Sequence, residues 1–500
     1  MIRRPLFAIL ALLPFCVLAG GAAPSKAAAP YPNIILILTD DQDLGSLEHM
    51  PRIRDLIARQ GLTFTQHVVP LSLCCPSRAT ILTGLYPHNH KVYTNFPPDG
   101  GYERFDELGR EETTLATALH AAGYRTALFG KYLNGYPGEE GASHVPPGWD
   151  EWASPVHGSP YASYNYTLNE NGKTVKYGNG AEAYMTDVLA GKATAFVRGA
   201  AGGQPFFLYL ATYAPHKPAT PARRHASLFA DLQAPRTPSF DEPDVRDKPA
   251  RIRNSKRLTA WQIATIDALY RKQMRSLQAV DEAVAALVKA LQETGQLADT
   301  YILFTSDNGF HMGQHRLEPG KYTPYESDVR VPLLVRGPGV PAGAASAALT
   351  SSVDLAPTLA ELAGAKLAVT PDGRSLAPLF HGQTPAGWRQ IVLLEQFAFP
   401  PAPPKADKTL EPPDLQDEKA SAAYPAHVGL RAAGFKLVEY GTGEREVYDL
   451  LQDPDELVNL RNRVPRKWMN ALAQLARTLS SCAGEACRQI ESRPLPAPPW

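Results

Sequence analysis

The stretch "NIILILTDDQD" (Asn33–Asp43) joins an uninterrupted apolar run to two adjacent carboxylates. A continuous apolar run of strand length is typical of a parallel strand that is buried on both faces of a sheet. The run ends at Asp40 and Asp41, so we expect both carboxylates at the carboxyl end of a central strand.

Patterns of helix, glycine and strand then recur along the chain, at residues 50–69 ("MPRIRDLIARQGLTFTQHVV"), 113–136 ("TTLATALHAAGYRTALFGKYLNGY") and 278–309 ("QAVDEAVAALVKALQETGQLADTYILFTSDNG"). This alternation predicts an α/β fold with a large, doubly wound, mostly parallel sheet flanked by helices. Ligands of such sheets gather at the carboxyl ends of the strands. Lys131, Asp307 and Asn308 follow predicted strands, so we expect them near Asp40 and Asp41.

Three parts of the chain differ in composition. We expect a secretory signal peptide at 1–29, the α/β domain at 30–384 and a smaller α+β domain with an antiparallel sheet at 385–500. Within the last part, "HVGLRAAGFKLVEYGTGEREVYDL" alternates and turns at Gly441–Gly443, as a hairpin does. The proline-rich, charged stretch at about 397–419 predicts an exposed insertion.

The N-terminus has two arginines, an apolar stretch from Pro5 to Leu18 and then small residues, which is typical of a secretory signal. The alternative, a membrane anchor, is disfavoured because the apolar stretch is shorter than the ~20 residues that a span needs. We therefore expect an exported protein, periplasmic or secreted, without stable membrane insertion.

Charge is balanced, with 50 Lys+Arg and 50 Asp+Glu, so no overall field favours binding to nucleic acid. Any anion site must be local. The basic segment "RIRNSKR" (Arg251–Arg257) has two interpretations, a grip on a polyanion or an ordinary solvated face, with the second favoured.

The five cysteines fall into three groups. Cys16 leaves with the signal, and Cys482 and Cys487 in "SSCAGEACRQ" have the spacing of a small-loop disulfide in an oxidising compartment. Cys74 and Cys75 remain. A disulfide between adjacent cysteines is strained, so we expect one of them to do chemistry, the alternative being a buried inert pair.

The surrounding stretch, "LSLCCPSRATILTG" (Leu71–Gly84), predicts a helix from about Ser77, with Pro76 at its first position. Cys74 and Cys75 would then lie at the positive end of this helix, with Arg78 one turn in. Backbone donors and a guanidinium together predict an anion site for phosphate or sulfate.

Asp40, Asp41, Asp307 and Asn308 offer only hard oxygen ligands, which suit Ca²⁺ or Mg²⁺ and not zinc. Each pair taken alone could be a polar strand end or a turn. Two such pairs at strand ends of one chain favour a single metal site.

These residues carry a resemblance to a known family. "CCPSRATILTG" resembles the sulfatase signature C-x-P-S-R-x-x-x-L-T-G, and further sulfatase-like segments follow in the expected order: "TDDQ", "GYRTALFGKY", "YAPHKP", "SDNGFHMGQH", "GKYTPYE" and "EVYDLLQDPDELVNL". The chain thus resembles the formylglycine-dependent sulfatases of the alkaline-phosphatase-like superfamily. The adjacent cysteines, "YPHNHKVYTN", "GKYLNGY" and "CAGEAC" are most similar to the N-acetylglucosamine-6-sulfatase branch, with extracellular heparan endosulfatases as neighbours.

The resemblance implies a sulfuric ester hydrolase acting on sulfated saccharides of the N-acetylglucosamine-6-sulfate kind, or on aryl sulfates. It implies that a formylglycine-generating maturation enzyme converts Cys74 into an aldehyde, which hydrates to a diol. One hydroxyl attacks sulfur, and the second then expels sulfate. The variable position, Cys75, receives no role.

The resemblance also assigns roles to other residues. It implies one Ca²⁺, or Mg²⁺, held by Asp40, Asp41, residue 74, Asp307 and Asn308. Arg78, Lys131 and Lys321 are implied as cationic donors to the diol and the sulfate oxygens. His216 in "APHKP" is implied as the acid that protonates the leaving alkoxide.

The sequence departs from the family at Leu133, where many sulfatases carry a histidine assigned to deprotonating the diol. The residues that could replace it are His88, His90, His144 and His311, and the sequence does not choose among them.

Three alternatives stay open. A phosphate or phosphonate monoesterase of the same superfamily would need more histidine ligands for paired zinc, and Asn308 stands where one would be. A cysteine phosphatase would need an arginine where Thr80 or Ile81 stands. A non-catalytic binder of sulfated glycans would keep the cationic pocket and an unmodified Cys74, and would release no sulfate.

Overall fold

The computed structural model describes residues 1–2, 31–398 and 424–500. The expected signal peptide and proline-rich insertion lie outside these residues, except for residues 1–2 and 397–398. The predicted boundary between residues 384 and 385 stays a prediction. Within the described part of the chain, no helix is both long enough and apolar enough to cross a membrane.

A ten-stranded sheet forms the centre of the described structure, in the order β11-β2-β10-β9-β1-β8-β4-β5-β6-β7. Its strands are β1 (Asn33–Thr39), β2 (Leu62–Phe64), β4 (Arg125–Gly130), β5 (Glu151–Gly158), β6 (Tyr166–Glu170), β7 (Lys173–Tyr177), β8 (Phe206–Ala211), β9 (Thr300–Ser306), β10 (Leu333–Arg336) and β11 (Ala344–Ser346). The short strands β3 (His67–Val68) and β12 (Thr350–Ser351) pair with each other.

The middle of this sheet is parallel. Strand β1 pairs in parallel with β8 on one edge and β9 on the other, so that Leu36 lies between Tyr209 and Leu303. Strand β4 extends the parallel block from β8 to β5. Antiparallel pairs occur further out, where β10 meets β9 and β6 meets β5. The predicted mostly parallel sheet is confirmed, with β1 at its centre.

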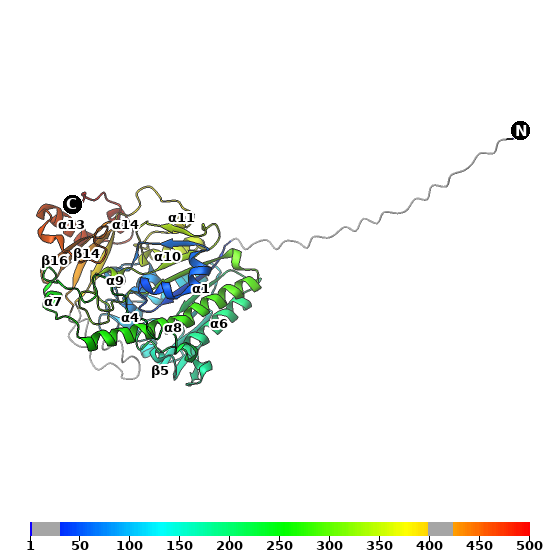
Figure 1. Cartoon of the computed structure of the whole chain (residues 1–500). Coiled ribbons are helices and arrows are strands. Elements are labelled where there is room, and N and C mark those ends of the chain that lie inside the picture. Colours follow the sequence, from blue (N-terminus) through cyan, green and yellow to red (C-terminus); the bar gives the residue numbers. More distant parts are fainter. Residues whose placement is uncertain (3–30, 399–423) are drawn as a thin grey trace.

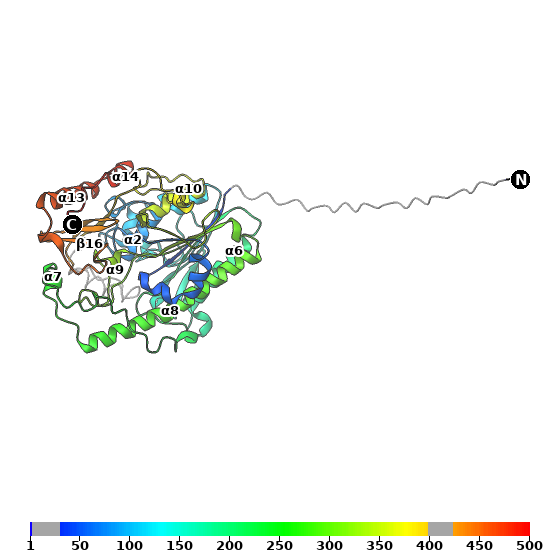
Figure 2. The ribbon, with the colours of Figure 1, turned by 45° about the horizontal axis from the view of Figure 1, so that its top comes forward.

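Helices cover both faces of the sheet, because β1 is apolar on both sides. Ile34, Leu36 and Leu38 pack into one core cluster and Ile35 and Ile37 into another on the opposite face. Figures 1 and 2 show α6 and α8 together, with α10 on the other side of the sheet. The helices are α1 (Pro51–Ile53), α2 (Cys74–Thr83), α3 (Pro87–His90), α4 (Gly101–Glu107), α5 (Leu115–Ala121), α6 (Met185–Gly199), α7 (Ala250–Arg253), α8 (Ala260–Glu293), α9 (Glu326–Val329), α10 (Leu355–Leu362), α11 (Ala377–Phe380), α13 (Arg466–Leu479) and α14 (Glu485–Glu491).

Helix α2 begins earlier than the sequence predicted. It starts at Cys74, three residues before Ser77, and Leu73 is its N-cap. Pro76 is therefore the third residue of the helix and not the first. This position is permitted because the N–H groups of the whole first turn lack partners within a helix. Both cysteines thus belong to the first turn itself.

A second, smaller sheet follows the ten-stranded one. It is antiparallel, in the order β13-β14-β15-β16, with strands β13 (Ile391–Gln396), β14 (His427–Ala432), β15 (Phe435–Tyr440) and β16 (Arg445–Asp449). The predicted hairpin that turns at Gly441–Gly443 is confirmed as β15 and β16. Helices α13 and α14 contribute to the same core cluster, and a disulfide joins Cys482 to Cys487 as predicted.

Candidate active site

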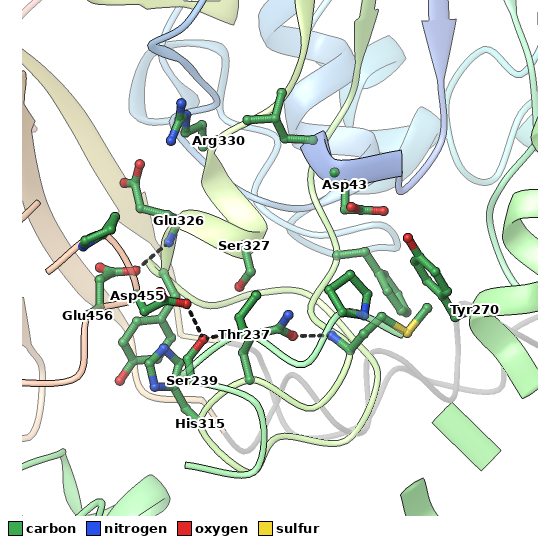
Figure 3. A pocket seen from close by; sticks show the side chains of 18 residues that line it. Asp43, Thr237, Ser239, Tyr270, His315, Glu326, Ser327, Arg330, Asp455 and Glu456 are labelled. Carbon is green, nitrogen blue, oxygen red and sulfur yellow. Dashed lines mark hydrogen bonds between the residues drawn. The ribbon is translucent and has the colours of Figure 1, made fainter. Parts of the chain in front are cut away.

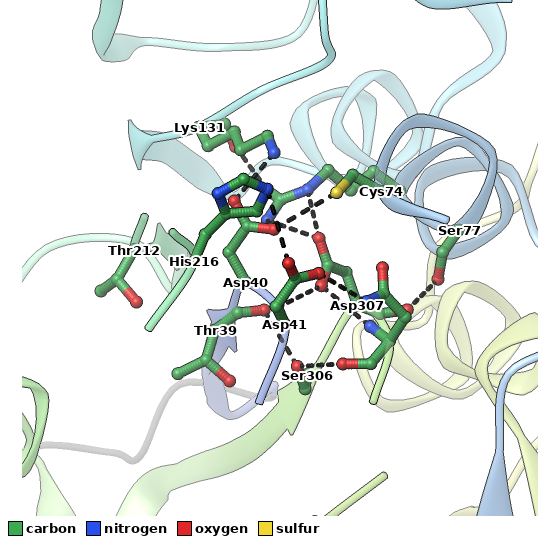
Figure 4. Close-up of polar contacts among 12 residues, drawn as sticks. Thr39, Asp40, Asp41, Cys74, Ser77, Lys131, Thr212, His216, Ser306 and Asp307 are labelled. Carbon is green, nitrogen blue, oxygen red and sulfur yellow. Dashed lines mark hydrogen bonds and ion pairs between the residues drawn. The ribbon is translucent and has the colours of Figure 1, made fainter. Parts of the chain in front are cut away.

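The strand ends of the parallel block bring the predicted polar residues together (Figure 4). Asp40 and Asp41 follow β1, Lys131 follows β4, and Asp307 and Asn308 follow β9. The site also takes Cys74 and Arg78 from α2, His216 from the loop after β8, and Lys321 from the loop after β9. Each of these nine side chains is at most 1% exposed. The sequence therefore predicted a set of residues that does converge.

Two backbone positions shape this convergence. Gly130 closes β4 with φ 122°, and a Cβ there would lie 1.7 Å from the Ala211 carbonyl oxygen, so only glycine lets β4 deliver Lys131 at this point. Asp41 adopts a left-handed conformation with φ 65°, which is uncommon for a residue with a side chain. Such strain is typical of functional sites, and it places consecutive carboxylates in one centre.

The thiol of Cys74 lies inside this centre. Its Sγ is 2.8 Å from the Lys321 Nζ and 3.4 Å from the Asp40 Oδ1. Burial raises the pKa of the thiol well above its ordinary value, and the Asp40 carboxylate acts in the same direction. An unmodified Cys74 is thus a poor thiolate nucleophile, unlike the cysteine of a phosphatase.

Each carboxylate of the Asp40–Asp41 pair has a lysine partner. The Asp40 Oδ2 lies 2.8 Å from the Lys131 Nζ, and the Asp41 Oδ1 lies 2.7 Å from the Lys321 Nζ. Burial opposes the charge on Asp40, but Lys131 and the other neighbouring cations outweigh it and hold its pKa below the usual range. Likewise, burial disfavours the Lys321 ammonium, but Asp41 keeps its pKa well above the ordinary value. These two ion pairs offset the desolvation cost of burying the charges.

His216 faces Asp41 from the loop after β8. Its Nδ1–H donates to the Lys217 carbonyl at 2.7 Å, and its Nε2 lies 3.4 Å from the Asp41 Oδ2. Because a carbonyl oxygen only accepts, the Nδ1 contact fixes the tautomer and leaves Nε2 turned into the centre.

Arg78 contacts protein groups in this structure. Its Nε donates to the Asp307 Oδ2 at 2.9 Å, and its Nη1 donates to the Lys131 carbonyl at 2.9 Å. The N–H of Cys75 donates to the Asn95 Oδ1, at 2.9 Å. The expected anion site at the start of α2 is therefore partly filled by the protein's own acceptors, and Arg78 orients Asp307 and the end of β4.

The donor set fits a hard cation. Asp40, Asp41, Asp307 and Asn308 contribute buried oxygens to the centre, and the Asp41 Oδ2 and Asn308 Oδ1 are without a hydrogen-bond partner among the described residues. Such unsatisfied buried oxygens are costly unless something binds them. Asp40, Asp41, Cys74 and His216 also lie close enough to share an ion.

The four histidines that could replace the one missing at Leu133 are held in different places. Leu133 itself is buried in the core. The His88 Nδ1 pairs with Glu395 and His144 pairs with Glu111, while the ring of His90 contacts Thr80. None of these three lines the cleft described below.

His311 is the remaining candidate, and it does line that cleft. Its Nδ1 lies 2.9 Å from the Asp328 Oδ1, and it borders the same cleft as Lys321. The structure thus brings His311 near the centre and keeps the other three in contacts elsewhere.

Two features of the site had no signal in the sequence. The Tyr161 ring lies 4.5 Å from the His216 ring and 5.0 Å from the Lys131 Nζ, so it covers one side of the centre. Asn95 holds the first turn of α2. Asn95 lies in a loop and Tyr161 in a short 3-10 helix (Pro160–Ala162), and the course of these irregular segments could not be read from periodicity.

A cleft of about 600 Å³ reaches the centre at Lys321. Its walls come from Arg251, residues 255–259, Gln262 and residues 316–322, together with Lys217, His311 and Tyr424. A separate pocket of about 230 Å³ is shown in Figure 3. Many of its polar groups are already paired: Glu326 with Arg431 and Lys436, and Ser239 with Asp455. We therefore interpret this second pocket as part of the junction with the smaller sheet.

Comparison with known proteins agrees with this geometry. The family model described as Sulfatase matches residues 32–365. Human N-acetylglucosamine-6-sulfatase is 38% identical over 481 residues, covering 92% of this chain and 87% of the human protein. A putative extracellular sulfatase Sulf-1 homolog of Caenorhabditis elegans is 40% identical over 382 residues, covering 74% of this chain and 53% of the relative.

Solved structures give the same result. A structure in complex with its substrate D-glucosamine-2-N,6-O-disulfate has a TM-score of 0.71 and 26% identity, covering 90% of this chain and 97% of that one. A phosphonate monoester hydrolase from Silicibacter pomeroyi has a TM-score of 0.68 and 26% identity, covering 90% and 94%. The family match spans more than half of the chain, and the human relative is similar over nearly its whole length. The chain accordingly belongs to the sulfatase family and is a sulfuric ester hydrolase.

Proposed function

We propose that this protein hydrolyses sulfate esters of saccharides of the N-acetylglucosamine-6-sulfate kind, through a formylglycine derived from Cys74. The observation that carries the proposal is the placement of the Cys74 Sγ within 3.4 Å of both the Lys321 Nζ and the Asp40 Oδ1, in a centre closed to solvent. Burial raises the pKa of this thiol, which disfavours an unmodified thiolate as the nucleophile.

The chain's own residues have defined tasks in this scheme. The hydrated aldehyde of residue 74 has two hydroxyl groups on one carbon. One forms a bond to sulfur as the sugar alcohol leaves, and the second loses its proton as the carbon–oxygen bond to sulfate breaks, which restores the aldehyde. A serine at this position would keep a stable sulfate ester.

Lys321 contacts the thiol directly, so its ammonium would contact the oxygens of the diol and of the sulfate. Lys131, held by Asp40, would contribute a second positive charge. Fixed positive charges in a water-excluded centre stabilise charge that builds up in the transition state. Arg78 acts through Asp307 and is a positioning residue in this scheme.

His216 is suited to give a proton to the leaving alkoxide. Its Nδ1–H is committed to a carbonyl oxygen, so the proton to be transferred is on Nε2, and Asp41 stabilises the protonated ring. A positioned acid of this kind matters most for leaving groups that are strongly basic, such as sugar hydroxyls.

We propose that Asp40, Asp41, Asp307 and Asn308, together with residue 74, hold one Ca²⁺ or Mg²⁺. Such an ion, when bound, polarises a sulfate oxygen and lowers the pKa of a neighbouring hydroxyl. The three carboxylates are balanced by Arg78, Lys131 and Lys321. A divalent ion would make the centre positive overall, which suits a negatively charged ester.

The saccharide preference rests on likeness to relatives. The human relative is named for N-acetylglucosamine 6-sulfate, and the solved neighbour holds a glucosamine disulfate. Export, to the periplasm or outside the cell, is part of the proposal, as is a maturation enzyme that modifies Cys74. The Cys482–Cys487 disulfide supports an oxidising location.

The test is release of inorganic sulfate by the mature protein from N-acetylglucosamine 6-sulfate, other sulfated monosaccharides and 4-nitrophenyl sulfate. We expect sulfate release from the 6-sulfated glucosamine at the highest kcat/KM. Absence of sulfate release from every ester, by protein whose residue 74 is shown to be an aldehyde, would overturn the proposal.

A phosphonate monoesterase is a second candidate, because the Silicibacter pomeroyi enzyme shares the fold. Release of 4-nitrophenol, measured on 4-nitrophenyl sulfate and on 4-nitrophenyl phenylphosphonate, separates the two. We expect sulfate esters to be preferred, and a higher kcat/KM on the phosphonate would favour the second candidate.

A further inference from the structure

The proposed reaction needs a group that takes up a proton in its second step. The free hydroxyl of sulfated residue 74 has to lose its proton as sulfate leaves. Lys131 and Lys321 carry ammonium groups, which only donate hydrogen bonds, and the guanidinium of Arg78 is likewise only a donor. The carboxylates of the centre are assigned to the metal, and His216 is assigned to the first step. None of these groups has the second proton as its task.

His311 lines the cleft together with Lys321, and a carboxylate holds its ring. The His311 Nδ1 lies 2.9 Å and 3.0 Å from the two carboxylate oxygens of Asp328. Because an ionised carboxylate only accepts, Nδ1 carries the hydrogen and Nε2 keeps its lone pair. Nε2 makes no hydrogen bond with the residues that the structure describes. His311 therefore offers a proton acceptor at the cleft.

The carboxylate of Asp328 is itself fixed by several donors. It accepts from the backbone N–H and the hydroxyl of Thr323, at 3.0 Å and 2.6 Å, and from the Ser327 hydroxyl at 3.0 Å. Asp328 is fully buried and His311 is 2% exposed. A carboxylate fixed behind an imidazole orients the ring and stabilises the imidazolium that forms when Nε2 takes up a proton.

Backbone contacts place His311 beside the segment that carries Lys321. The His311 N–H donates to the Gly320 carbonyl at 2.8 Å, and the Gly320 N–H donates to the His311 carbonyl at 3.1 Å. A Cβ on Gly320 would lie 3.2 Å from the His311 Nε2, so glycine leaves this nitrogen uncovered. The next residue, Lys321, contacts the Cys74 Sγ through its Nζ. The imidazole and residue 74 are thus joined by one short segment of the cleft wall.

We propose that His311 is the proton acceptor of the second step, through one water molecule in the cleft, and that Asp328 is its positioning residue. The hydroxyl of sulfated residue 74 gives its proton through this water to the His311 Nε2. The bond between carbon and the sulfate oxygen breaks, its electron pair leaves with sulfate, and the hydroxyl oxygen forms the aldehyde C=O. The imidazolium then releases its proton to solvent, and water adds to the aldehyde to renew the diol. This inference rests on the proposed function.

The test uses 4-nitrophenyl sulfate, because its weakly basic leaving group makes the first step fast. The enzyme is mature His311→Ala, with the aldehyde at residue 74 confirmed by a hydrazide. We expect a burst of about one 4-nitrophenol per aldehyde, and then a steady-state rate about 100-fold below that of the unsubstituted enzyme. Mass spectrometry of the acid-quenched peptide 71–78 should show a sulfate ester on residue 74.

Further variants separate proton transfer from a structural role. His311→Gln keeps an amide that can contact Asp328 but cannot take up a proton, so it should give the same burst and the same slow rate. Added imidazole should raise the steady-state rate of His311→Ala, because it supplies a proton acceptor. The matched control is His120→Ala, which removes another histidine paired with an aspartate, at 3.2 Å from the Asp150 Oδ1. It should keep the unsubstituted rate and show no burst.

An unchanged steady-state rate in His311→Ala would overturn this role and assign the proton to His216, which has lost its own in the first step. A slow rate without a burst, or the full rate in His311→Gln, would show that His311 is only structural. Failure of the unsubstituted enzyme with its aldehyde to release any 4-nitrophenol would instead overturn the proposed function, which the other outcomes leave standing.

Discussion

The ammonium of Lys321 touches the thiol of Cys74, with 2.8 Å between Nζ and Sγ, while the neighbouring Cys75 is buried in the apolar core. The two cysteines are adjacent in sequence and yet face different environments. Only the first is placed for chemistry.

Replacing each cysteine in turn should show that activity depends on position 74 and not on position 75. Cys74→Ser and Cys74→Ala should both lower sulfate release by at least about 1,000-fold with the fold intact, because neither side chain forms a diol that can expel sulfate. Cys75→Ser should keep most of the activity. The peptide spanning residues 71–78 of active enzyme should react with an aldehyde-specific hydrazide. Active enzyme in which residue 74 is fully alkylated as a free thiol would contradict the formylglycine mechanism.

Asn308→Ala should weaken metal binding. The change removes the Asn308 Oδ1, one of the buried oxygens without a hydrogen-bond partner in the described structure. We expect at least a tenfold higher dissociation constant for Ca²⁺ or Mg²⁺, measured by calorimetry on chelator-treated protein, with activity falling in parallel. The exposed Asn254→Ala is the control. Stoichiometric zinc in active enzyme, by elemental analysis, would refute the assignment of a hard cation.

His216→Ala should affect substrates according to their leaving groups. If His216 protonates the departing oxygen, kcat on a sugar 6-sulfate should fall by about 100-fold or more, whereas 4-nitrophenyl sulfate, whose leaving group is weakly basic, should lose far less. His225→Ala, which removes a histidine paired with Glu282, is the control. Equal losses on both substrates would argue against an acid role.

The stability of the protein should depend on pH through Glu242. Burial raises the pKa of this carboxyl from 4.5 to about 7, against the opposing charge of Lys248. Since the folded state then holds a proton that the unfolded state has released, the free energy of unfolding should fall as pH rises from about 4.5 to 7, by up to about 3 kcal/mol. Glu242→Gln should remove this share of the slope in urea titrations. Parallel pH curves for the two proteins would show that Glu242 titrates normally when folded.

The sequence predicted the centre of the fold because strong local signals coincide there. The apolar runs before Asp40 and before Asp307 are typical of parallel strands that are buried on both faces of a sheet. The carboxyl ends of such strands lie at the same edge of the sheet, so the residues that follow them meet there. The start of α2 was wrong by three residues because Pro76 is compatible with more than one position in a first turn. Tyr161 and Asn95 were not predicted because the contacts of a short 3-10 helix and of a loop depend on tertiary structure.

The position of β1 between two parallel neighbours has a consequence for how the enzyme loses activity. Amides of a strand bonded on both edges exchange with solvent only when the whole domain opens, whereas short surface helices open locally. Asp40 and Asp41 directly follow such a strand, whereas α7 (Ala250–Arg253) is a short helix with exposed arginines. On gentle heating, amide exchange should therefore rise in α7 before it rises in β1, and the ability to cleave small sulfate esters should be lost only when β1 opens.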